Sequence, residues 1–549
     1  MTHDSRLWWQ HGVVYQIYPR SFMDSNGDGI GDLAGITSRM DYLAALGIDA
    51  LWLSPIYPSP NADFGYDVSN YTDVDPMYGD LTTFDEMLAA AHARNLHVII
   101  DFVPNHSSNQ HPWFLESRSS RTNSKRDWYI WRDAKPDGSL PNNWLSLFGG
   151  PAWKLDPLTG QYYLHTFLEE QPDLNWRNPE VKAAMLDALR FWLTRGVDGF
   201  RIDVAHFIMK DPDMRDNPPN PNYKVDTGAY KSMGEYDALL AVNSIGHPDV
   251  HDIFREIRAL LDSFSAESPR YSVGEIHVFD WAEWAKYYGS KNDELHMPFN
   301  FALIGARWQA LVARAIVEAL EKAMPEGAWP NYVLSNHDEH RIASRIGSAA
   351  ARTAMMLLLT LRGTPTMYYG DELGMIDGVI PPEREQDPWG KRVPGLGLGR
   401  DPERTPMQWA TNPNAGFSPE GIQTWLPVAD GYETCNVAWE ESDPHSMLTL
   451  TRHLLALRRA NPALNSGSYA TITGVPDDCY VYERRTDSSQ FLIALNFSSK
   501  PQVIHLPDRQ TDSAHVALST QLDHDPAAPL DLSEFVLRAN EGLIIRIGD

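Results

Sequence analysis

Cysteine is nearly absent from this chain, which has only Cys435 and Cys479 among its 549 residues. Two thiols cannot build a disulfide framework, and they cannot supply a four-thiolate zinc site. A disulfide-stapled secreted scaffold and a zinc-ribbon protein are therefore excluded. A reducing compartment is the simpler expectation.

Basic residues are scarce relative to acidic ones. The chain has 46 Lys and Arg residues against 73 Asp and Glu residues, which gives a formal charge of −27 at pH 7. A surface with this excess of negative charge repels polyanions. We therefore expect no nucleic-acid partner and no membrane partner.

Long hydrophobic runs are also missing. The longest run, residues 354–361, is far shorter than the ~20 residues that a membrane-spanning helix needs. The amino-terminal residues contain no apolar segment followed by a small-residue cleavage site. The sequence therefore predicts a cytoplasmic protein.

The residues that are present are those of a large globular protein. Apolar residues make up 43% of the chain, which excludes a disordered or collagen-like protein. A chain of 549 residues exceeds what a single hydrophobic core usually organises. We expect one large domain with at least one smaller companion.

Short β-branched or aromatic runs alternate with helix-period stretches, as in βα units around a parallel sheet. Between the first two runs, apolar residues at helical spacing from Leu33 to Leu46 predict one helix that Gly47 ends. The predicted strands are 13–18, 50–55, 96–103, 196–203, 271–276, 295–301, 329–338 and 364–372. This pattern predicts an α/β fold, a (β/α)8 TIM barrel.

Two segments depart from the βα alternation. A polar, aromatic-rich stretch follows the third strand and is too long for an ordinary connection. After about residue 465, alternating strands predict a separate C-terminal antiparallel β domain. The predicted organisation is a barrel over 1–103, an inserted domain over 104–171, the rest of the barrel with a long loop after strand eight over 172–464, and the β domain over 465–549.

Charged residues recur where the predicted strands end. These residues are Asp101 to His106, Arg201 with Asp203, Glu275, and His337 with Asp338. The carboxyl ends of barrel strands meet on one face, where the active sites of such folds lie. Paired carboxylates there suit glycosyl transfer, in which one attacks the anomeric carbon and the other protonates the leaving oxygen.

The spacing of these residues suggests individual roles. Arg201 and Asp203 lie on the same side of a strand, so the guanidinium is expected to keep Asp203 ionised as the nucleophile. Glu275 is the expected acid and later base, and a neighbouring anion should raise its pKa. For a lone aspartate a helix cap or buried ion pair is the more common role, so the prediction depends on the coincidence of several strand ends. A metallohydrolase with His106 and His337 as ligands is an alternative.

The motifs at these strand ends resemble the α-amylase family, glycoside hydrolase family 13. The matching segments are DFVPNH at 101–106, GFRID at 199–203, GEI at 274–276, NHD at 336–338 and GTPTMYYGDE at 363–372. The resemblance implies Asp203 as nucleophile, Glu275 as acid/base and Asp338 as transition-state stabiliser. It also implies that Arg201, His106 and His337 hold the sugar, and it implies the same barrel and inserted domain with a C-terminal antiparallel β-sandwich.

Finer motifs resemble the oligo-1,6-glucosidase and α-glucosidase branch of that family. They are QPDLNW at 171–176, DFGYD at 63–67 and GRDPERTPMQW at 399–409. The resemblance implies that Asp63, Tyr66 and Arg400 line a closed pocket for a terminal glucose. A buried pair that grips a free 4-hydroxyl would be left unsatisfied by a continuing chain, which predicts exo action. For Arg400, a loop-stabilising ion pair is the alternative.

The segment DSNGDGIGD spaces oxygen donors as an EF-hand loop does. The donors are Asp24, Asn26, Asp28, the carbonyl of Ile30, and Asp32. Position twelve is Gly35, so the usual bidentate glutamate is missing. The sequence predicts a structural Ca²⁺ or Mg²⁺ of modest affinity and no catalytic cofactor. An ion-free turn is the alternative.

The leading hypothesis is a retaining exo-α-glucosidase for small α-glucosides such as maltose, isomaltose or sucrose-like sugars, with glucosyl transfer as a possible second outcome. Trehalose synthase or sucrose isomerase is the near alternative. A non-catalytic, transporter-associated barrel is the alternative from another class, although such relatives carry a membrane anchor and usually lack the full carboxylate set. We expect a monomer or weak homo-oligomer.

Overall fold

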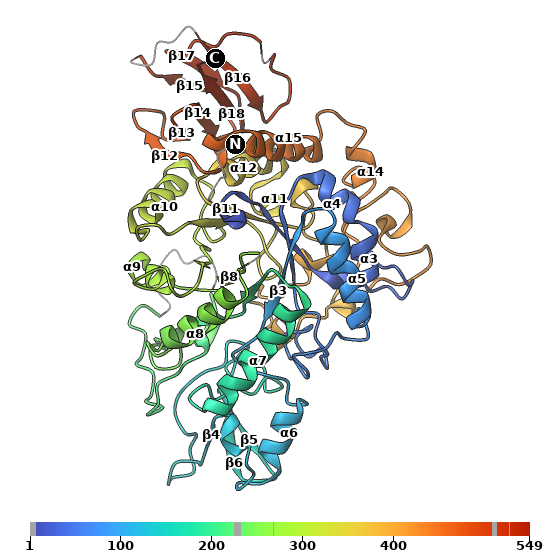
Figure 1. Cartoon of the computed structure of the whole chain (residues 1–549), viewed down its shortest axis with the longest axis vertical. Helices are drawn as coiled ribbons and strands as arrows, with labels where there is room; N and C mark the ends of the chain where they lie inside the picture. The colour runs from blue at the N-terminus through green and yellow to red at the C-terminus, as the bar shows by residue number, and fades with distance from the viewer. Residues whose placement is uncertain (1–6, 224–231, 267, 508–512, 526, 549) are drawn as a thin grey trace.

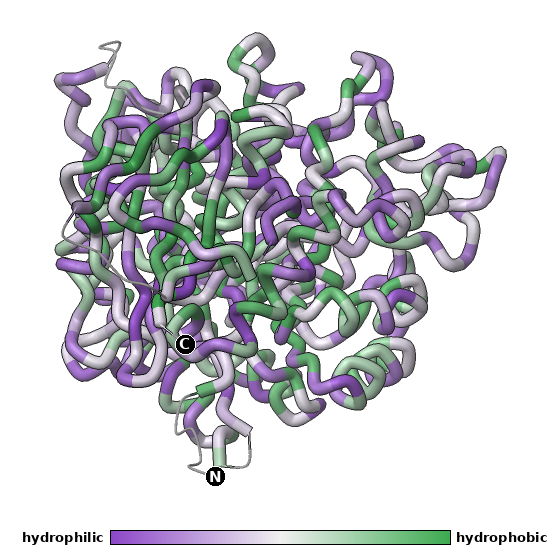
Figure 2. Tube along the Cα trace, turned by 90° about the horizontal axis from the view of Figure 1, so that it is seen from above, coloured by the Kyte–Doolittle hydropathy of each residue, from purple (hydrophilic) through white to green (hydrophobic). Residues whose placement is uncertain are grey.

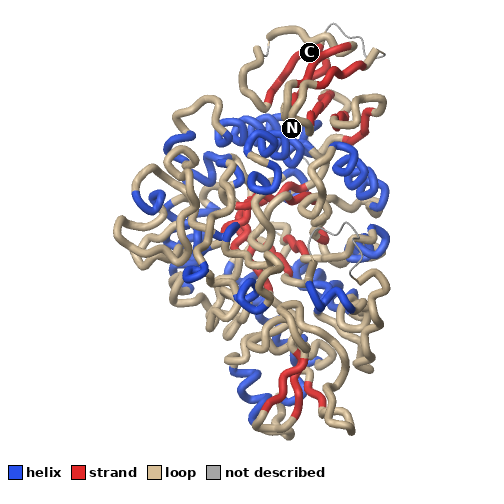
Figure 3. The backbone as a smooth tube through the Cα atoms, turned by 180° about the vertical axis from the view of Figure 1, so that it is seen from behind, coloured by secondary structure: helices blue, strands red, loops and turns tan. Residues whose placement is uncertain are grey.

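The computed structural model describes residues 7–223, 232–266, 268–507, 513–525 and 527–548. A central barrel carries a small lobe at one end, around α6 and β4–β6, and an antiparallel β unit at the other (Figure 1). The view from behind shows the same three groups of strands separated by helices and loops (Figure 3). The ends of the first and last predicted domains, residues 1–6 and 549, lie outside the described residues.

The barrel is one sheet of eight strands, and every pair of neighbours is parallel. In spatial order the strands are β10 (Asn331–Val333), β11 (Thr364–Tyr368), β1 (Val14–Ile17), β2 (Ala50–Leu53), β3 (His97–Phe102), β7 (Gly199–Ile202), β8 (Tyr271–Gly274) and β9 (Met297–Pro298). All eight predicted strand positions contain one of these strands, and the fold-class prediction is confirmed.

The two edge strands meet through side chains. Asn331 accepts a hydrogen bond from the backbone of Asn300 at 3.0 Å and donates one to the carbonyl of Pro298 at 2.5 Å. These amide contacts satisfy groups that a ladder between β9 and β10 would otherwise pair. They bring the sheet close to a closed barrel.

The barrel strands are buried on both faces, and this accounts for their nearly continuous apolar sequence. Hydrophobic stretches are concentrated in the interior of the chain trace, whereas many outer loops are hydrophilic (Figure 2). The helices are α1 (Trp8–His11), α2 (Pro19–Phe22), α3 (Leu33–Ser38), α4 (Met40–Leu46), α5 (Leu81–His92), α6 (Pro112–Ser119), α7 (Pro179–Arg195), α8 (Val250–Ser263), α9 (Trp281–Ala285), α10 (Ala310–Ala323), α11 (Ile342–Ile346), α12 (Ser348–Thr360), α13 (Pro388–Arg392), α14 (Val437–Glu440), α15 (Met447–Ala460) and α16 (Pro462–Asn465).

The helix predicted from Leu33 to Leu46 is two helices. Arg39, at φ −106° and ψ 8°, separates α3 from α4, so the prediction of one continuous helix is wrong. Helical spacing continues across the break, which is why periodicity did not reveal it. Gly47 ends α4 at φ 99°, a conformation that glycine adopts without a Cβ clash, as predicted.

The inserted lobe lies between β3 and α7. It contains α6 and a three-stranded antiparallel sheet of β4 (Trp131–Arg132), β6 (Gln161–Leu164) and β5 (Trp153–Asp156). Lys210, which is 3% exposed, donates to Asp173 at 2.7 Å and to Asn105 at 2.6 Å. These buried contacts join both ends of the insertion to the segment that follows β7.

The carboxyl-terminal unit has two antiparallel sheets with their own apolar core. One sheet has the order β12 (Ser468–Ile472), β13 (Cys479–Arg485), β14 (Gln490–Asn496), β18 (Gly542–Ile547) and β16 (Ala514–Ser519); the other pairs β15 (Gln502–His505) with β17 (Glu534–Leu537). In the part of the chain that the structure describes, no helix has both the length and the apolar character needed to cross a bilayer.

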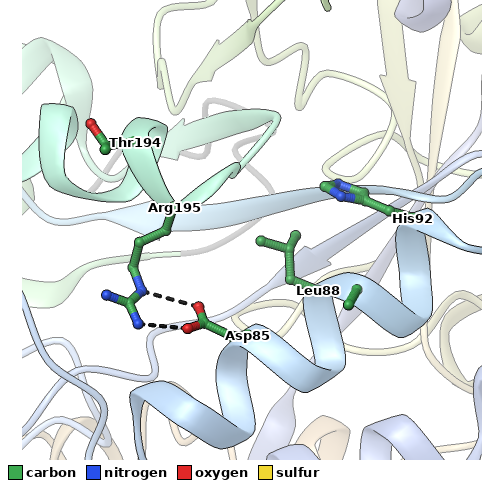
Figure 4. A pocket seen from close by; sticks show the side chains of 6 residues that line it. Asp85, Leu88, His92, Thr194 and Arg195 are labelled. Atoms are coloured by element: carbon green, nitrogen blue, oxygen red, sulfur yellow. Dashed lines mark hydrogen bonds and ion pairs between the residues drawn. The ribbon is translucent and has the colours of Figure 1, made fainter.

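A surface groove of about 470 Å³ lies between α5 and α7 on the outside of the barrel. Arg195 and Asp85 form an ion pair of 2.7 Å across it, beside Leu88 and His92 (Figure 4). None of the strand-end residues predicted for the site lines this groove. We interpret the groove as a gap between neighbouring helices.

Candidate active site

The parallel register brings the strand-end charges together. Asp101 on β3 is the sheet partner of Arg201 on β7, and the next residue pair along, Ile202 with Gly274, brings Glu275 level with Asp203. Side chains at such matched positions share one layer of the barrel face. The residues predicted from separate motifs are therefore neighbours.

Arg201 is the centre of this cluster, and its side chain is 2% exposed. Its Nη1 group donates to Asp101 at 2.8 Å and to Asp203 at 2.7 Å, while its Nη2 group donates to Glu275 at 2.6 Å. A planar guanidinium can bind carboxylates with two fixed N–H groups, which an ammonium cannot do. One cation thus holds Asp203 and Glu275 side by side.

Glu275 has two further donors. The backbone N–H of Val204 donates to its Oε2 at 2.9 Å, and His277 contacts its Oε1 at 2.6 Å. Burial acts to raise the pKa of Glu275, but Arg201 and then His277 stabilise the anion, and the pKa is lowered overall. Our expectation of a raised pKa is wrong because it did not include the effects of Arg201 and His277 on this carboxylate.

Asp203 shows the opposite balance. Burial raises its pKa, Arg201 opposes this, and the carboxylates of Glu275, Asp101 and Asp338 raise it further. The direction of this shift is opposite to our expectation that the guanidinium keeps Asp203 ionised. Since the groups lie so close together, they titrate as a coupled set.

His337 and Tyr66 form one wall of the cluster. The Tyr66 hydroxyl lies 2.6 Å from Nε2 of His337 and 3.2 Å from Asp101, and the two rings are parallel. Burial lowers the pKa of His337 to about 3, so the imidazole is neutral at pH 7. The Gln16 amide, 2.7 Å from Nδ1, donates to that nitrogen and leaves the proton on Nε2.

Asp338 lies between two arginines. Its Oδ1 accepts from Arg404 at 2.9 Å and from Arg400 at 3.1 Å. Burial acts to raise the pKa of Asp338, but His337, Arg400, Arg404 and Arg201 lower it well below its usual range. Asp338 is therefore an anion in this site.

Arg400 also reaches the predicted glucose-pocket residue. Its Nη2 donates to Asp63 at 2.7 Å, and both side chains are buried. The same guanidinium contacts Asp387 at 2.6 Å, so it also forms the loop ion pair that was the alternative. Gln171, the first residue of QPDLNW, donates to Asp63 at 3.2 Å and lies 3.1 Å from His106.

His106 is held from both sides. Its Nε2 lies 3.1 Å from the carbonyl of Tyr66, and its ring packs against Phe167 at 5.1 Å between centroids. Burial lowers the pKa of His106 to about 4, so it is a neutral hydrogen-bonding group at pH 7. All nine predicted catalytic and sugar-contacting residues belong to one connected network.

Sequence reasoning missed several members of this network, among them Gln16, Arg404, Asp387, Gln171 as a side-chain partner, and His277. Arg404 and Asp387 lie in the long loop after β11, where no sequence periodicity indicates which way a side chain points. The one available signal was proximity, since Arg404 is four residues after Arg400 and His277 two after Glu275.

The predicted metal loop forms a tight turn. Asp24 accepts from the backbone of Asn26, Gly27 and Gly29, and Asn26 and Asp28 accept from residues two further along. Asp32 caps α3 through Gly35. The oxygen donors fit a hard cation in type, and Asn26 and Asp28 are exposed to solvent. The residue at position twelve, Gly35, supplies only an N–H to this turn.

Comparisons with known proteins agree with this geometry. Residues 16–467 match the family described as "Alpha amylase, catalytic domain". The chain is 42% identical to a probable alpha-glucosidase of Rhizobium meliloti (strain 1021), over 96% of this chain and 97% of that protein. It is 36% identical to an oligo-1,6-glucosidase of Parageobacillus thermoglucosidasius, over 99% of both chains.

A solved structure of the alpha-glucosyl transfer enzyme XgtA superposes with a TM-score of 0.91 at 40% identity, covering 99% of this chain and 100% of that one. The resemblance to the α-glucosidase branch, inferred from motifs, is confirmed by these matches. The chain belongs to the α-amylase family and is a glycoside hydrolase.

Proposed function

We propose that the protein is a retaining, exo-acting α-glucosidase that removes glucose from the ends of short α-glucosides. The observation that carries this proposal is the pair of contacts from one guanidinium, Arg201, to both Asp203 and Glu275. Retaining enzymes keep their two carboxyl groups only ~5–5.5 Å apart, so that one can attack the sugar directly. Carboxylates bound to the two amino groups of one arginine suit that arrangement.

In the first step, Asp203 attacks the anomeric carbon while Glu275 gives its proton to the departing oxygen. The bond from that carbon to the leaving oxygen breaks, and a glucosyl ester forms on Asp203. In the second step, Glu275 takes a proton from water as the water oxygen displaces Asp203. Asp338, kept anionic by its arginines, stabilises the positive charge that develops on the sugar ring.

The protonation of Asp203 and Glu275 before substrate binds adds a requirement to these two reaction steps. Burial raises the pKa of Asp203, whereas Arg201 and His277 lower that of Glu275. The reaction needs the reverse distribution, with Asp203 ionised and Glu275 protonated. Asp203 must therefore lose a proton, and Glu275 must gain one, as the sugar binds.

Exo action follows from the buried pair Asp63 and Arg400. Each offers a charged hydrogen-bonding group, and a sugar 4-hydroxyl can both donate to Asp63 and accept from Arg400. A polymer continuing through that position would remove the hydroxyl and leave the buried charges without that partner. Small substrates such as maltose, isomaltose and sucrose-like sugars satisfy the requirement.

Glucosyl transfer is a second candidate outcome, and one observation favours it. The similar structure XgtA is that of an alpha-glucosyl transfer enzyme. Chemically, transfer differs from hydrolysis only in which oxygen displaces Asp203. Isomerisation of sucrose or maltose is the third outcome, in which the released sugar itself returns as acceptor.

We also propose a structural Ca²⁺ or Mg²⁺ in the 24–32 loop, held by Asp24, Asn26, Asp28, the Ile30 carbonyl and Asp32. The cation would contribute rigidity to the turn before α3. Its expected affinity is modest because a bidentate carboxylate at position twelve is missing. The chemistry at Asp203 does not involve this loop.

The test is product analysis of maltose, isomaltose, trehalose and sucrose treated side by side with the wild-type protein and with Asp203→Ala. The proposal predicts glucose from at least one of the disaccharides with the wild type and no turnover with Asp203→Ala. Products of equal length to the substrate would indicate isomerisation, and longer products would indicate transfer. Unchanged activity in Asp203→Ala would overturn the proposal.

A further inference from the structure

The acid/base candidate Glu275 has an unusual distribution of partners. Two donors, Arg201 and the Val204 backbone, hold its Oε2, whereas its Oε1 is held by His277 at 2.6 Å. The Glu275 side chain is 9% exposed and that of His277 is 45% exposed. His277 therefore connects the buried carboxyl with solvent.

The imidazole is kept in this orientation by packing. The His277 ring stacks on Phe301 with 4.8 Å between centroids and 15° between planes. Phe301 itself stacks on Phe299, directly after β9. The contact between His277 and Glu275 thus has a supporting aromatic surface and does not depend on a freely rotating side chain.

We propose that His277 is a positioning residue that shares one proton with Glu275 and thereby sets when Glu275 acts as the acid. The inference rests on the proposed glucosidase function. In the resting site His277 is an imidazolium with protons on both ring nitrogens, Glu275 is a carboxylate, and the proton that they share lies mainly on Nε2. As the substrate oxygen approaches, that proton moves to Oε1 of Glu275 and then to the leaving oxygen.

The second reaction step returns a proton to His277 and Glu275. Water gives its proton to Oε1 as its oxygen bonds to the anomeric carbon, and the ester bond to Asp203 breaks. The proton then returns to the imidazole. No proton is gained or lost over the two steps, and Glu275 is neutral only while the substrate oxygen is near.

Several charged groups act on His277. Partial burial lowers its pKa, but the hydrogen bond and charge of Glu275 raise it, and Glu339 and Asp338 raise it further. His206, whose ring centre is 6.0 Å away, has its pKa lowered by burial to about 3 and stays neutral. The basic limb of the pH profile should therefore report the pair, above the ordinary histidine range of ~6.5.

The test variant is His277→Gln, whose side-chain amide can still donate to Oε1 but cannot titrate. For aryl α-glucosides with poor leaving groups, kcat should fall by about 10- to 100-fold, a part of the ~10²–10⁴ that acid catalysis contributes. For 2,4-dinitrophenyl α-glucoside, whose leaving group needs no proton, the first step should be nearly unchanged. KM should change little, and the basic limb should move to lower pH.

The matched control is His505→Gln, which removes an imidazole 3.1 Å from Glu534 in the carboxyl-terminal unit. It should leave the leaving-group dependence and pH profile at wild-type values. A second variant, Phe301→Leu, keeps the imidazole but removes its stack and should shift both readouts in the same direction by a smaller amount.

Two results would overturn the inference: a wild-type pH profile in His277→Gln, or an equal loss of rate for all leaving groups. Failure of the proposed function gives a different result, because the wild-type protein itself would then turn over no α-glucoside. Circular dichroism of each variant distinguishes these outcomes from unfolding.

Discussion

The pair Asp63 and Arg400 makes a quantitative prediction about the terminal sugar. Asp63→Asn keeps the shape of the side chain and removes its charge. A hydrogen bond to a charged group contributes ~1.5–3 kcal/mol. Since each 1.36 kcal/mol is a factor of ten, kcat/KM for maltose should fall by about 10- to 150-fold. The free energy of unfolding should change less than when one partner of a buried ion pair is removed and the other is left unpaired, because Arg400 keeps Asp387 at 2.6 Å.

The assay pairs this variant with a modified substrate, a maltoside whose terminal 4-hydroxyl is replaced by hydrogen. If Asp63 acts through that hydroxyl, the wild-type protein loses a similar factor on the deoxy substrate, and Asp63→Asn loses little more. The control is Asp156→Asn, which affects the ion pair of 2.7 Å between the buried Asp156 and the half-buried Arg118 in the inserted lobe. If the loss from Asp63→Asn and the loss from the deoxy substrate multiply when the variant acts on that substrate, the assigned contact is refuted.

Two further predictions concern stability. Burial raises the pKa of Glu440 to about 8, whereas an unfolded glutamate has ~4.3, so folding stability should decrease as pH rises from ~4.3 to ~8. Glu440→Gln should therefore raise the Tm increasingly over that window, and equal Tm differences at pH 5 and pH 8 would contradict this reasoning. For the 24–32 loop, millimolar Ca²⁺ should raise the Tm of the wild-type protein relative to EDTA, but not that of Asp28→Ala, because a ligand bound only to the folded state stabilises it by mass action. Equal shifts in both proteins would exclude this loop as the cation site, and EDTA should leave glucosidase activity intact.

The barrel was predictable because its strands are buried on both faces and keep a strong apolar signal. Even β9, only Met297–Pro298 in the structure, lies inside a predicted strand, residues 295–301. The break at Arg39 was not predictable, because α3 and α4 keep the same helical spacing on either side of it. Such a break depends on packing, which spacing does not report.

The site was predictable where residues lie on strands. Asp101, Arg201 and Asp203 follow from strand ends, because register fixes which side chains are neighbours. Charged partners that come from loops were not predictable, and the pKa of Glu275 shows the consequence. A neighbouring anion suggested a raised pKa, but Arg201 and the loop residue His277 lower it.

The central claim is that Asp203 becomes bonded to glucose during turnover. Glu275→Ala should react with 2,4-dinitrophenyl α-glucoside faster than it can activate water, so the glucosyl-enzyme should accumulate. Mass spectrometry of the digested protein is then predicted to find one added glucosyl group, on the peptide that contains Asp203. A label on another residue, or no label together with an initial product of inverted anomeric configuration, would contradict the account.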